Sequence, residues 1–268
     1  MNLGAAAVVL RPRTLAEVLD LACRLSISLA FGLYARLSAV VLVPVFAGCL
    51  ALRYEAGWGW PAVWAVAVAG GSVAQGVFTV GVGRLLFAED VAPARVLRLF
   101  GRRLGSYLGA LLLARLLLAL SCLPFFLGLP FAWTRLVFVH EASLLEGAGP
   151  RDALRRSSRF VAGRSMSAFG ALLALLLTQA GFVIVAELLG QGLVDQVLQL
   201  GRPFGGLFAD GGSPYALAGL LLSVPYAATA RFLGYVDGRT RSDGWDIQLR
   251  FMAITASAAS AGGREEAA

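Results

Sequence analysis

The pattern of apolar residues predicts six membrane-spanning helices. A helix needs about 20 mostly apolar residues to cross a bilayer, and the six stretches that approach this length are 34–52, 61–83, 104–121, 124–143, 166–189 and 214–236. The third and fourth stretches are nearly continuous, but Pro124 and Pro130 interrupt a run that is about twice as long as one span requires. We therefore expect a tight hairpin at residues 121–124.

The arginines predict the orientation of these spans. Most of them lie in the N-terminal segment, the second and fourth connections and the C-terminal tail. The members of this set are Arg11, Arg13, Arg24, Arg36, Arg84, Arg95, Arg98, Arg102, Arg103, Arg151, Arg155, Arg156, Arg159, Arg164, Arg239, Arg241, Arg250 and Arg264. The alternate connections hold Arg53 and Arg202. Because basic loops stay in the cytoplasm, this bias predicts an even number of spans with both termini cytoplasmic.

Three of the basic segments also predict short amphipathic helices on the cytoplasmic side. Each begins near a proline, at Pro12, Pro93 or Pro150, and continues as an arginine-rich run. Thr14 and Glu17 have the spacing of a capping box. The predicted fold is therefore all-α, an integral membrane helical bundle of six transmembrane helices over residues 1–254. Residues 255–268 are rich in Ala, Ser and Gly and predict a disordered tail.

The composition excludes an ordinary soluble domain. Hydrophobic residues make up 58% of the chain and charged residues only 15%, whereas soluble domains carry about 25% charged residues. Every basic residue is arginine, so acetylation cannot remove the net charge of +7. The three cysteines lie far apart and predict neither a disulfide nor a zinc site. The first ten residues lack the basic segment of a signal peptide, so we expect a retained, cytoplasmic N-terminus.

Several polar side chains fall inside the predicted spans. They are Gln75, Arg115, Arg135, His140, Glu141, Gln179, Glu187 and Arg231. A charge in the bilayer is costly unless it is paired or hydrated. Similar depths along the spans predict two ion pairs, Arg115 with Glu187 and Glu141 with Arg231. Such pairs either hold helices together or form part of a transport pathway.

The sequence contains no familiar catalytic or metal-binding motif. We therefore expect no enzyme activity, no cofactor and no metal site. His140 is the only histidine, and it is either a proton-handling partner of Glu141 or an interfacial polar residue. Gly101, Gly105 and Gly109 form a doubled GxxxG pattern that predicts close helix packing, and Ser72 with Gly76 forms a second pair of small residues.

The positions of the arginines favour anionic phospholipid over nucleic acid as their counter-ion. They border spans at headgroup depth, without the interleaved aromatic residues of a nucleic-acid surface. A membrane or cytoplasmic protein is the other expected partner. Tyr54, Trp58, Trp60 and Trp64 cluster at the first external loop. They are either an interfacial aromatic belt or ordinary packing under a loop.

Three motifs resemble those of an uncharacterised family of bacterial multi-pass membrane proteins. This family is related to the membrane domain fused to some glycerophosphodiester phosphodiesterases. The first motif is RPRTLAEVLD at 11–20, followed by Cys23-Arg24-Leu25. The second combines Glu146-Gly147, ALRRS at 153–157 and Gly163-Arg164, and the third is YVDGRTRSDGWD at 235–246. The chain departs from the family pattern at Ala16, Ser158 and Asp243.

The resemblance covers nearly the whole chain and implies a six-span bundle of the bacterial inner membrane with cytoplasmic termini. It does not imply phosphodiesterase activity, because the catalytic barrel of those enzymes is a separate soluble domain. The three motifs mix acids with arginines and predict one cytoplasmic ion-pair network. Its candidate members are Glu17, Asp20, Glu146, Arg155, Arg156, Asp237, Arg239, Arg241 and Asp246.

These patterns predict a non-enzymatic scaffold or accessory subunit with an arginine-rich cytoplasmic face. A small-solute or lipid transporter that uses Arg115, Arg135 and Glu187 is the alternative. It predicts a water-filled cavity that reaches those residues. A third possibility, an enzyme acting on lipid headgroups, requires His140, Glu141 and Glu146 to converge on one cytoplasmic pocket.

Overall fold

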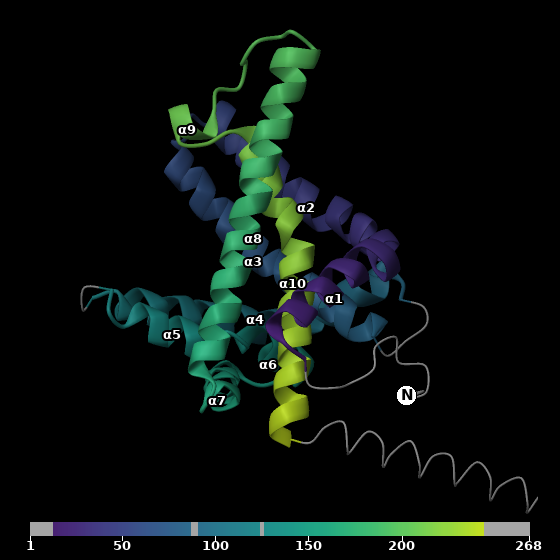
Figure 1. The fold of residues 1–268 in the computed structure, drawn as a ribbon, viewed down its shortest axis with the longest axis vertical. Helices are drawn as coiled ribbons and strands as arrows, with labels where there is room; N and C mark the ends of the chain where they lie inside the picture. The colour runs from purple at the N-terminus through teal and green to yellow at the C-terminus, as the bar shows by residue number, and fades with distance from the viewer. Residues whose placement is uncertain (1–12, 87–90, 124–125, 244–268) are drawn as a thin grey trace, which may run out of the picture.

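The computed structural model describes residues 13–86, 91–123 and 126–243, and this part of the chain is all-helical (Figure 1). The helices are α1 (Leu15–Arg24), α2 (Phe31–Tyr54), α3 (Trp60–Leu85), α4 (Pro93–Ser121), α5 (Leu129–Arg135), α6 (Val139–Leu145), α7 (Pro150–Val161), α8 (Ser165–Gly192), α9 (Leu207–Asp210) and α10 (Pro214–Asp243). Single π-helical turns extend α1 at Leu25–Leu29 and α8 at Leu193–Val197. The tail beyond residue 254 lies outside the described residues.

Five helices in the described part of the chain are long and apolar enough to cross a membrane. They are α2, α3, α4, α8 with its π-helical turn, and α10, and they indicate a multi-pass membrane protein. Helix α10 is the most buried of them and packs on α8, α3 and α1. Helices α2 and α8 leave large apolar side chains such as Val43 and Leu177 exposed. This distribution suits a bundle that is surrounded by lipid.

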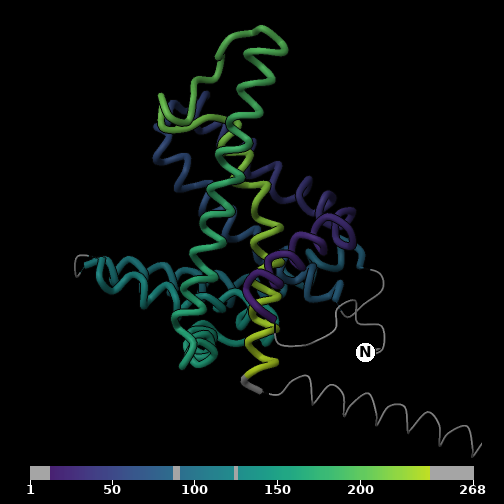
Figure 2. The backbone as a smooth tube through the Cα atoms, in the orientation of Figure 1, coloured from purple at the N-terminus to yellow at the C-terminus, as the bar shows by residue number. Residues whose placement is uncertain are grey.

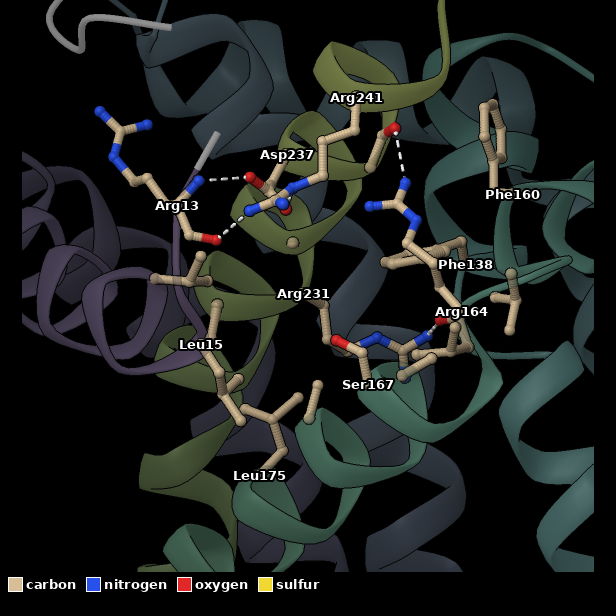
Figure 3. A pocket seen from close by; sticks show the side chains of 18 of the residues that line it. Arg13, Leu15, Phe138, Phe160, Arg164, Ser167, Leu175, Arg231, Asp237 and Arg241 are labelled. Carbon is tan, nitrogen blue, oxygen red and sulfur yellow. Dashed lines mark hydrogen bonds and ion pairs between the residues drawn. The ribbon is translucent and has the colours of Figure 1, made fainter. Parts of the chain in front are cut away.

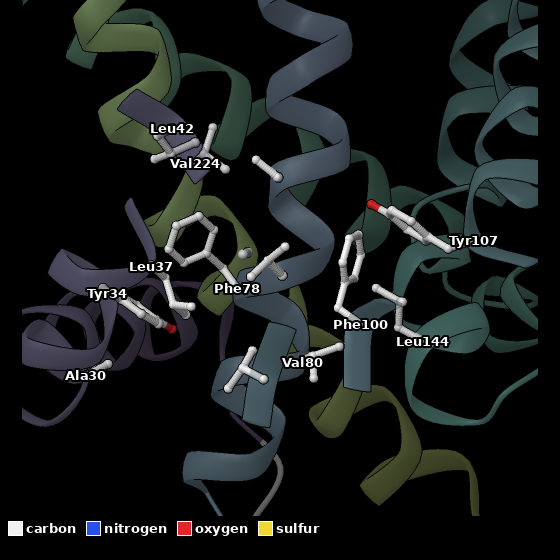
Figure 4. Packing of buried hydrophobic residues seen from close by; sticks show 14 of the residues in the cluster. Ala30, Tyr34, Leu37, Leu42, Phe78, Val80, Phe100, Tyr107, Leu144 and Val224 are labelled. Atoms are coloured by element: carbon white, nitrogen blue, oxygen red, sulfur yellow. The ribbon is translucent and has the colours of Figure 1, made fainter. Parts of the chain in front are cut away.

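The largest apolar cluster joins α2, α3, α4 and α10 (Figure 4). Phe78 of α3 is fully buried and contacts the ring of Tyr34 edge-on. On the other side of α3, the rings of Phe100 and Tyr107 pack against Gly76. The core is thus continuous across α3, and α4 is fixed to the bundle by its first half.

The predicted fourth span at 124–143 is not one helix. Its described residues form the short helices α5 and α6, separated by a turn at 136–138. Ser157 of α7 stabilises this break, because its hydroxyl donates to the carbonyl of Arg135 at 2.7 Å and accepts the N–H of Phe138 at 3.0 Å. These bonds replace bonds that a continuous helix would make internally.

Helices α4 and α5 form a hairpin that runs across the direction of α8 and α10 (Figure 2). Helix α4 packs mainly on α6, α3 and α7. Its second half and the start of α5 project away from the bundle with exposed apolar side chains. These are Leu112, Leu116, Leu120, Leu123, Phe126, Leu127 and Phe131. We call residues 112–123 and 126–131 the projecting hairpin.

Candidate functional site

Three of the arginine-bearing segments meet at the C-terminal turns of α10. Asp237 accepts the backbone N–H of Arg13 at 2.7 Å and forms an ion pair with Arg241 at 2.9 Å. Arg241 in turn donates to the carbonyl of Arg13 at 2.5 Å. Arg164, which precedes α8, donates to the carbonyl of Gly238 at 3.2 Å. Segments at residues 13, 164 and 237–241 are therefore joined directly, and we call this part of the molecule the arginine-rich end.

Glu146 ties α7 to α10 at the same end. Its carboxylate accepts bonds from Arg156 of α7 and from the hydroxyl of Tyr235, and it lies 3.6 Å from Nη1 of Arg239. The Glu146 side chain is 8% exposed, whereas that of Arg156 is 51% exposed. One nearly buried acid thus holds two elements that are far apart in the sequence.

The described residues show two parts of the predicted network. Asp237 pairs with Arg241, and Glu146 pairs with Arg156 and Arg239. Thr14 and Glu17 form the predicted capping box at the start of α1. The remaining predicted members lie elsewhere: Asp20 pairs with Arg24 on an exposed face, Arg155 is exposed without an ion pair among the described residues, and Asp246 lies outside them.

A pocket of about 350 Å³ lies between α1, α7, α8 and α10 (Figure 3). Its charged part is lined by Arg13, Arg164, Arg231, Arg241 and Asp237. Its apolar part is formed chiefly by Leu15, Val18, Ala168, Ala171, Leu175 and Ala230. Figure 3 shows Arg13, Arg164 and Arg241 towards the end of α10, Leu15 and Leu175 at the opposite side of the pocket, and Arg231 between them. The pocket is therefore amphipathic, with four guanidinium groups and one carboxylate around its charged part.

Arg231 connects this pocket to a buried acid. Its Nε lies 3.5 Å from the carboxylate of Glu141, and its Nη2 donates to the carbonyl of Val137. The sequence predicted the pair of Glu141 with Arg231, and the structure brings the two side chains together. Glu141 is fully buried. Burial raises the pKa of its carboxyl, an effect that the nearby charge of Arg231 opposes.

His140 belongs to a second buried polar group. The hydroxyl of Tyr107 donates to the carbonyl of Ser72 at 2.7 Å and lies 2.7 Å from Nδ1 of His140. Nδ1–H of the neutral imidazole then donates to the tyrosine oxygen. Burial lowers the pKa of His140 well below its usual range, and the charges of Arg231 and Arg115 act in the same direction. His140 thus serves as a neutral hydrogen-bond partner between α6 and α4.

The predicted pair of Arg115 with Glu187 is not formed. Arg115 donates to the hydroxyl of Ser72 at 2.8 Å. Glu187 lies near the far end of α8, where it accepts bonds from the N–H of Leu207 at 2.7 Å, from Gln191 and from Ser213. Helix α4 runs across the direction of α8 (Figure 1). Arg115 and Glu187 therefore lie at different depths, although each was expected near the outer end of its span.

The predicted glycine strip on α4 packs at only one of its three positions. Gly109 lies against Pro150 of α7, whereas Gly101 and Gly105 face open space in the described structure. The shallow second cavity, between α4 and the start of α7, lies beside this contact. A close contact between α3 and α4 is instead at Gly76.

The four aromatic residues predicted at the first external loop have two different environments. Trp60 and Trp64 pack under the loop at 211–212, whereas Tyr54 and Trp58 are about half exposed.

The sequence interpretation missed three features of the site. Tyr107 was not singled out, although a tyrosine in the middle of an apolar stretch is a signal for a buried hydrogen bond. The contribution of Arg13 through its backbone groups has no sequence signal, because any residue has the same N–H and carbonyl. The pocket itself depends on how α1 packs on α10 and could not be derived from the order of the segments.

The described residues contain no group of three or more His, Cys, Asp or Glu side chains that could hold a metal ion. Arg135 is exposed at the end of α5.

No family model matches the chain, and no curated protein or solved structure is significantly similar to it. Functional proposals for this chain therefore rest on its own residues.

Proposed function

We propose that this is a non-enzymatic protein of the bacterial inner membrane, a scaffold or accessory subunit with its arginine-rich end in the cytoplasm. The observation that carries the proposal is the convergence of the arginine-bearing segments on α10. Arginines that are not used there, Arg151, Arg155 and Arg159, lie on the exposed face of α7. Such a fixed, positively charged surface is suited to anionic headgroups or to an acidic protein partner.

The geometry gives less support to a transporter. Neither cavity described above is lined by Arg115, Arg135 or Glu187. Arg115 and Glu187 bind different groups in different parts of the molecule. The charges proposed for a transport pathway are thus not joined by either cavity.

The proposed enzyme site is also not assembled. His140 bonds to Tyr107, Glu141 faces Arg231, and Glu146 binds arginines of α7 and α10. None of these three side chains lines the pocket at the arginine-rich end. The residues expected to act on a lipid headgroup are therefore used in separate structural contacts.

A comparison of lipids tests the proposed role of the α7 surface. We expect a higher Tm in nanodiscs of phosphatidylglycerol than in phosphatidylcholine, with the difference reduced by salt. The triple variant Arg151→Gln, Arg155→Gln, Arg159→Gln should lose most of this difference, whereas Arg202→Gln should keep it. In parallel, a protein partner should co-purify with the wild type and not with the triple variant. Equal Tm values in both lipids, together with no arginine-dependent partner, would contradict the proposal.

A further inference from the structure

We propose that the amphipathic pocket between α1, α7, α8 and α10 binds one anionic phospholipid. Its phosphate contacts Arg164 and Arg231, and the beginning of one acyl chain lies along the apolar wall. This inference rests on the proposed function only in that the pocket opens at the membrane face where anionic headgroups are expected. Binding in detergent does not depend on orientation, so the two proposals can fail separately.

The charged part of the pocket has unused hydrogen-bond donors. Each guanidinium has five N–H groups. Arg164 uses Nη2 for the carbonyl of Gly238, and Arg231 uses Nη2 for the carbonyl of Val137. The Nε of Arg231 lies near Glu141 but makes no hydrogen bond within the described residues. The other N–H groups of both side chains have no partner in the described part of the chain, and a phosphate accepts such donors in pairs.

The single acid of the pocket is already engaged. Asp237 accepts from Arg13 and Arg241, and these contacts hold it on the side of α1. Glu141 does not line the pocket, but it fixes Arg231 from behind. The positive charge of Arg164 therefore has no carboxylate partner among the described residues, and an anion would supply one.

The other half of the pocket requires an apolar ligand group. Leu15 and Val18 of α1 face Ala171 and Leu175 of α8, with Ala230 of α10 beside them. A free phosphate would leave this wall uncovered, whereas an acyl chain would cover it with apolar contacts. Ser167 and 38% of Leu15 are exposed, so the pocket opens to the surface beside α1 and α8.

The size of the pocket limits how much of the lipid it holds. Its volume of about 350 Å³ is at the lower end of the range for small-molecule sites, about 300–1,000 Å³. It can therefore accommodate a phosphate with its glycerol and the start of one chain. The remainder of the lipid would extend along the apolar surface of α8, where Leu173 and Leu176 are exposed.

Lipid titration followed by native mass spectrometry tests this inference in detergent. The probes are phosphatidylglycerol, phosphatidylcholine and glycerol 3-phosphate, which has the anionic head without a chain. We expect one phosphatidylglycerol to bind at least tenfold more tightly than either of the other two. Arg164→Gln should weaken its binding about tenfold through loss of charged hydrogen bonds. Ala171→Phe, which fills the apolar part without a change of charge, should weaken it similarly.

The control is Arg202→Gln, which removes one exposed arginine from the loop before α9, outside the pocket, and should leave binding unchanged. Size-exclusion profiles establish that each variant is folded. Unchanged phosphatidylglycerol binding in both Arg164→Gln and Ala171→Phe would overturn the inference. Equal weakening by Arg202→Gln would also overturn it, because binding would then follow net charge alone. Glycerol 3-phosphate binding as tight as that of phosphatidylglycerol would overturn the acyl-chain contact.

Discussion

At the scale of single residues, two glycines on neighbouring helices have opposite roles. A Cβ atom at Gly76 would lie 2.7 Å from Phe100 and 2.8 Å from Tyr107, whereas a Cβ at Gly101 would have nothing within 4 Å. The GxxxG spacing predicted close packing at Gly101. Such a pattern identifies a smooth helix face, but it does not show whether another helix covers that face. The surroundings of each glycine predict different effects of the same substitution.

We predict that Gly76→Ala lowers the free energy of unfolding by about 1–3 kcal/mol through overpacking. Gly101→Ala should raise it by about 0.5–1 kcal/mol, because alanine favours the helix and no neighbour must move. Reversible unfolding in mixed detergent micelles measures both. Equal effects of the two substitutions would show that α3 and α4 do not pack through Gly76.

Two carboxylates of the predicted ion-pair network, Glu146 and Asp20, differ in the contacts that they make. Glu146 is nearly buried and binds three groups, whereas Asp20 and Arg24 are 60% and 75% exposed. We predict that Glu146→Ala costs about 1–3 kcal/mol, because charged hydrogen bonds are lost and partners are left unpaired. Asp20→Ala should cost less than about 0.5 kcal/mol, since exposed pairs contribute little. Thermal unfolding of both variants tests this, and a loss as large for Asp20→Ala would refute it.

Residue-level prediction from the sequence worked where the contact is local or lies on adjoining elements. The capping box of Thr14 and Glu17 depends only on spacing along one helix. The pair of Glu141 and Arg231 followed from comparing depths, and both residues lie towards the arginine-rich end. The same comparison gave the wrong partner for Arg115, because it assumed that every apolar stretch runs along the membrane normal.

At the scale of elements, the projecting hairpin is where the fold departs most from a simple bundle. The sequence predicted two spans at 104–121 and 124–143, and the structure has a long α4 followed by two short helices. Hydropathy measures the apolar length of a segment but not its direction. The direction is fixed by Tyr107 and Gly76 at the contact with α3 and by Ser157 at the break after α5.

This geometry predicts that the projecting hairpin lies within the membrane without crossing it. Leu123 is 77% exposed at its outer end and belongs to a run of exposed apolar side chains on the hairpin, which is typical of a lipid-facing surface. In a variant with the native cysteines replaced, Leu123→Cys should resist a charged maleimide added from either side of the membrane. Arg155→Cys on the exposed face of α7 is the labelling control. Labelling of Leu123→Cys from the outer side alone would support two full spans instead.

At the scale of the whole molecule, the arginine-rich connections lie at one end of the helical bundle. Helices α2 and α3 meet near the loop that contains α9, as the bond from Trp64 to the carbonyl of Gly211 shows. Helix α8 begins and α10 ends at the arginine-rich end, joined by Arg164 and Gly238. A hairpin at α4 and α5 returns the chain to the end from which it started. We therefore predict an even number of crossings whether or not the hairpin spans the membrane.

The sequence therefore predicted the all-helical class and the gathering of arginine-bearing segments. It predicted six continuous apolar helices, whereas the described residues contain five. The arginine count of a connecting segment does not depend on whether the neighbouring apolar stretch forms one long helix or two short ones. The positions of Arg13 and Arg241 against Asp237 needed the packing of α1 on α10. The pocket beside them is a consequence of the same packing.

The most direct test of the account is the side of the membrane on which the arginine-rich end lies. Single cysteines at Arg155 and at Glu55, which is exposed at the opposite end, can be introduced into the cysteine-free protein in bacterial cells. A membrane-impermeant maleimide should label Glu55→Cys in spheroplasts with an intact inner membrane and Arg155→Cys only after permeabilisation. Labelling of Arg155→Cys in intact spheroplasts would place the arginine-rich end outside and contradict the proposed orientation.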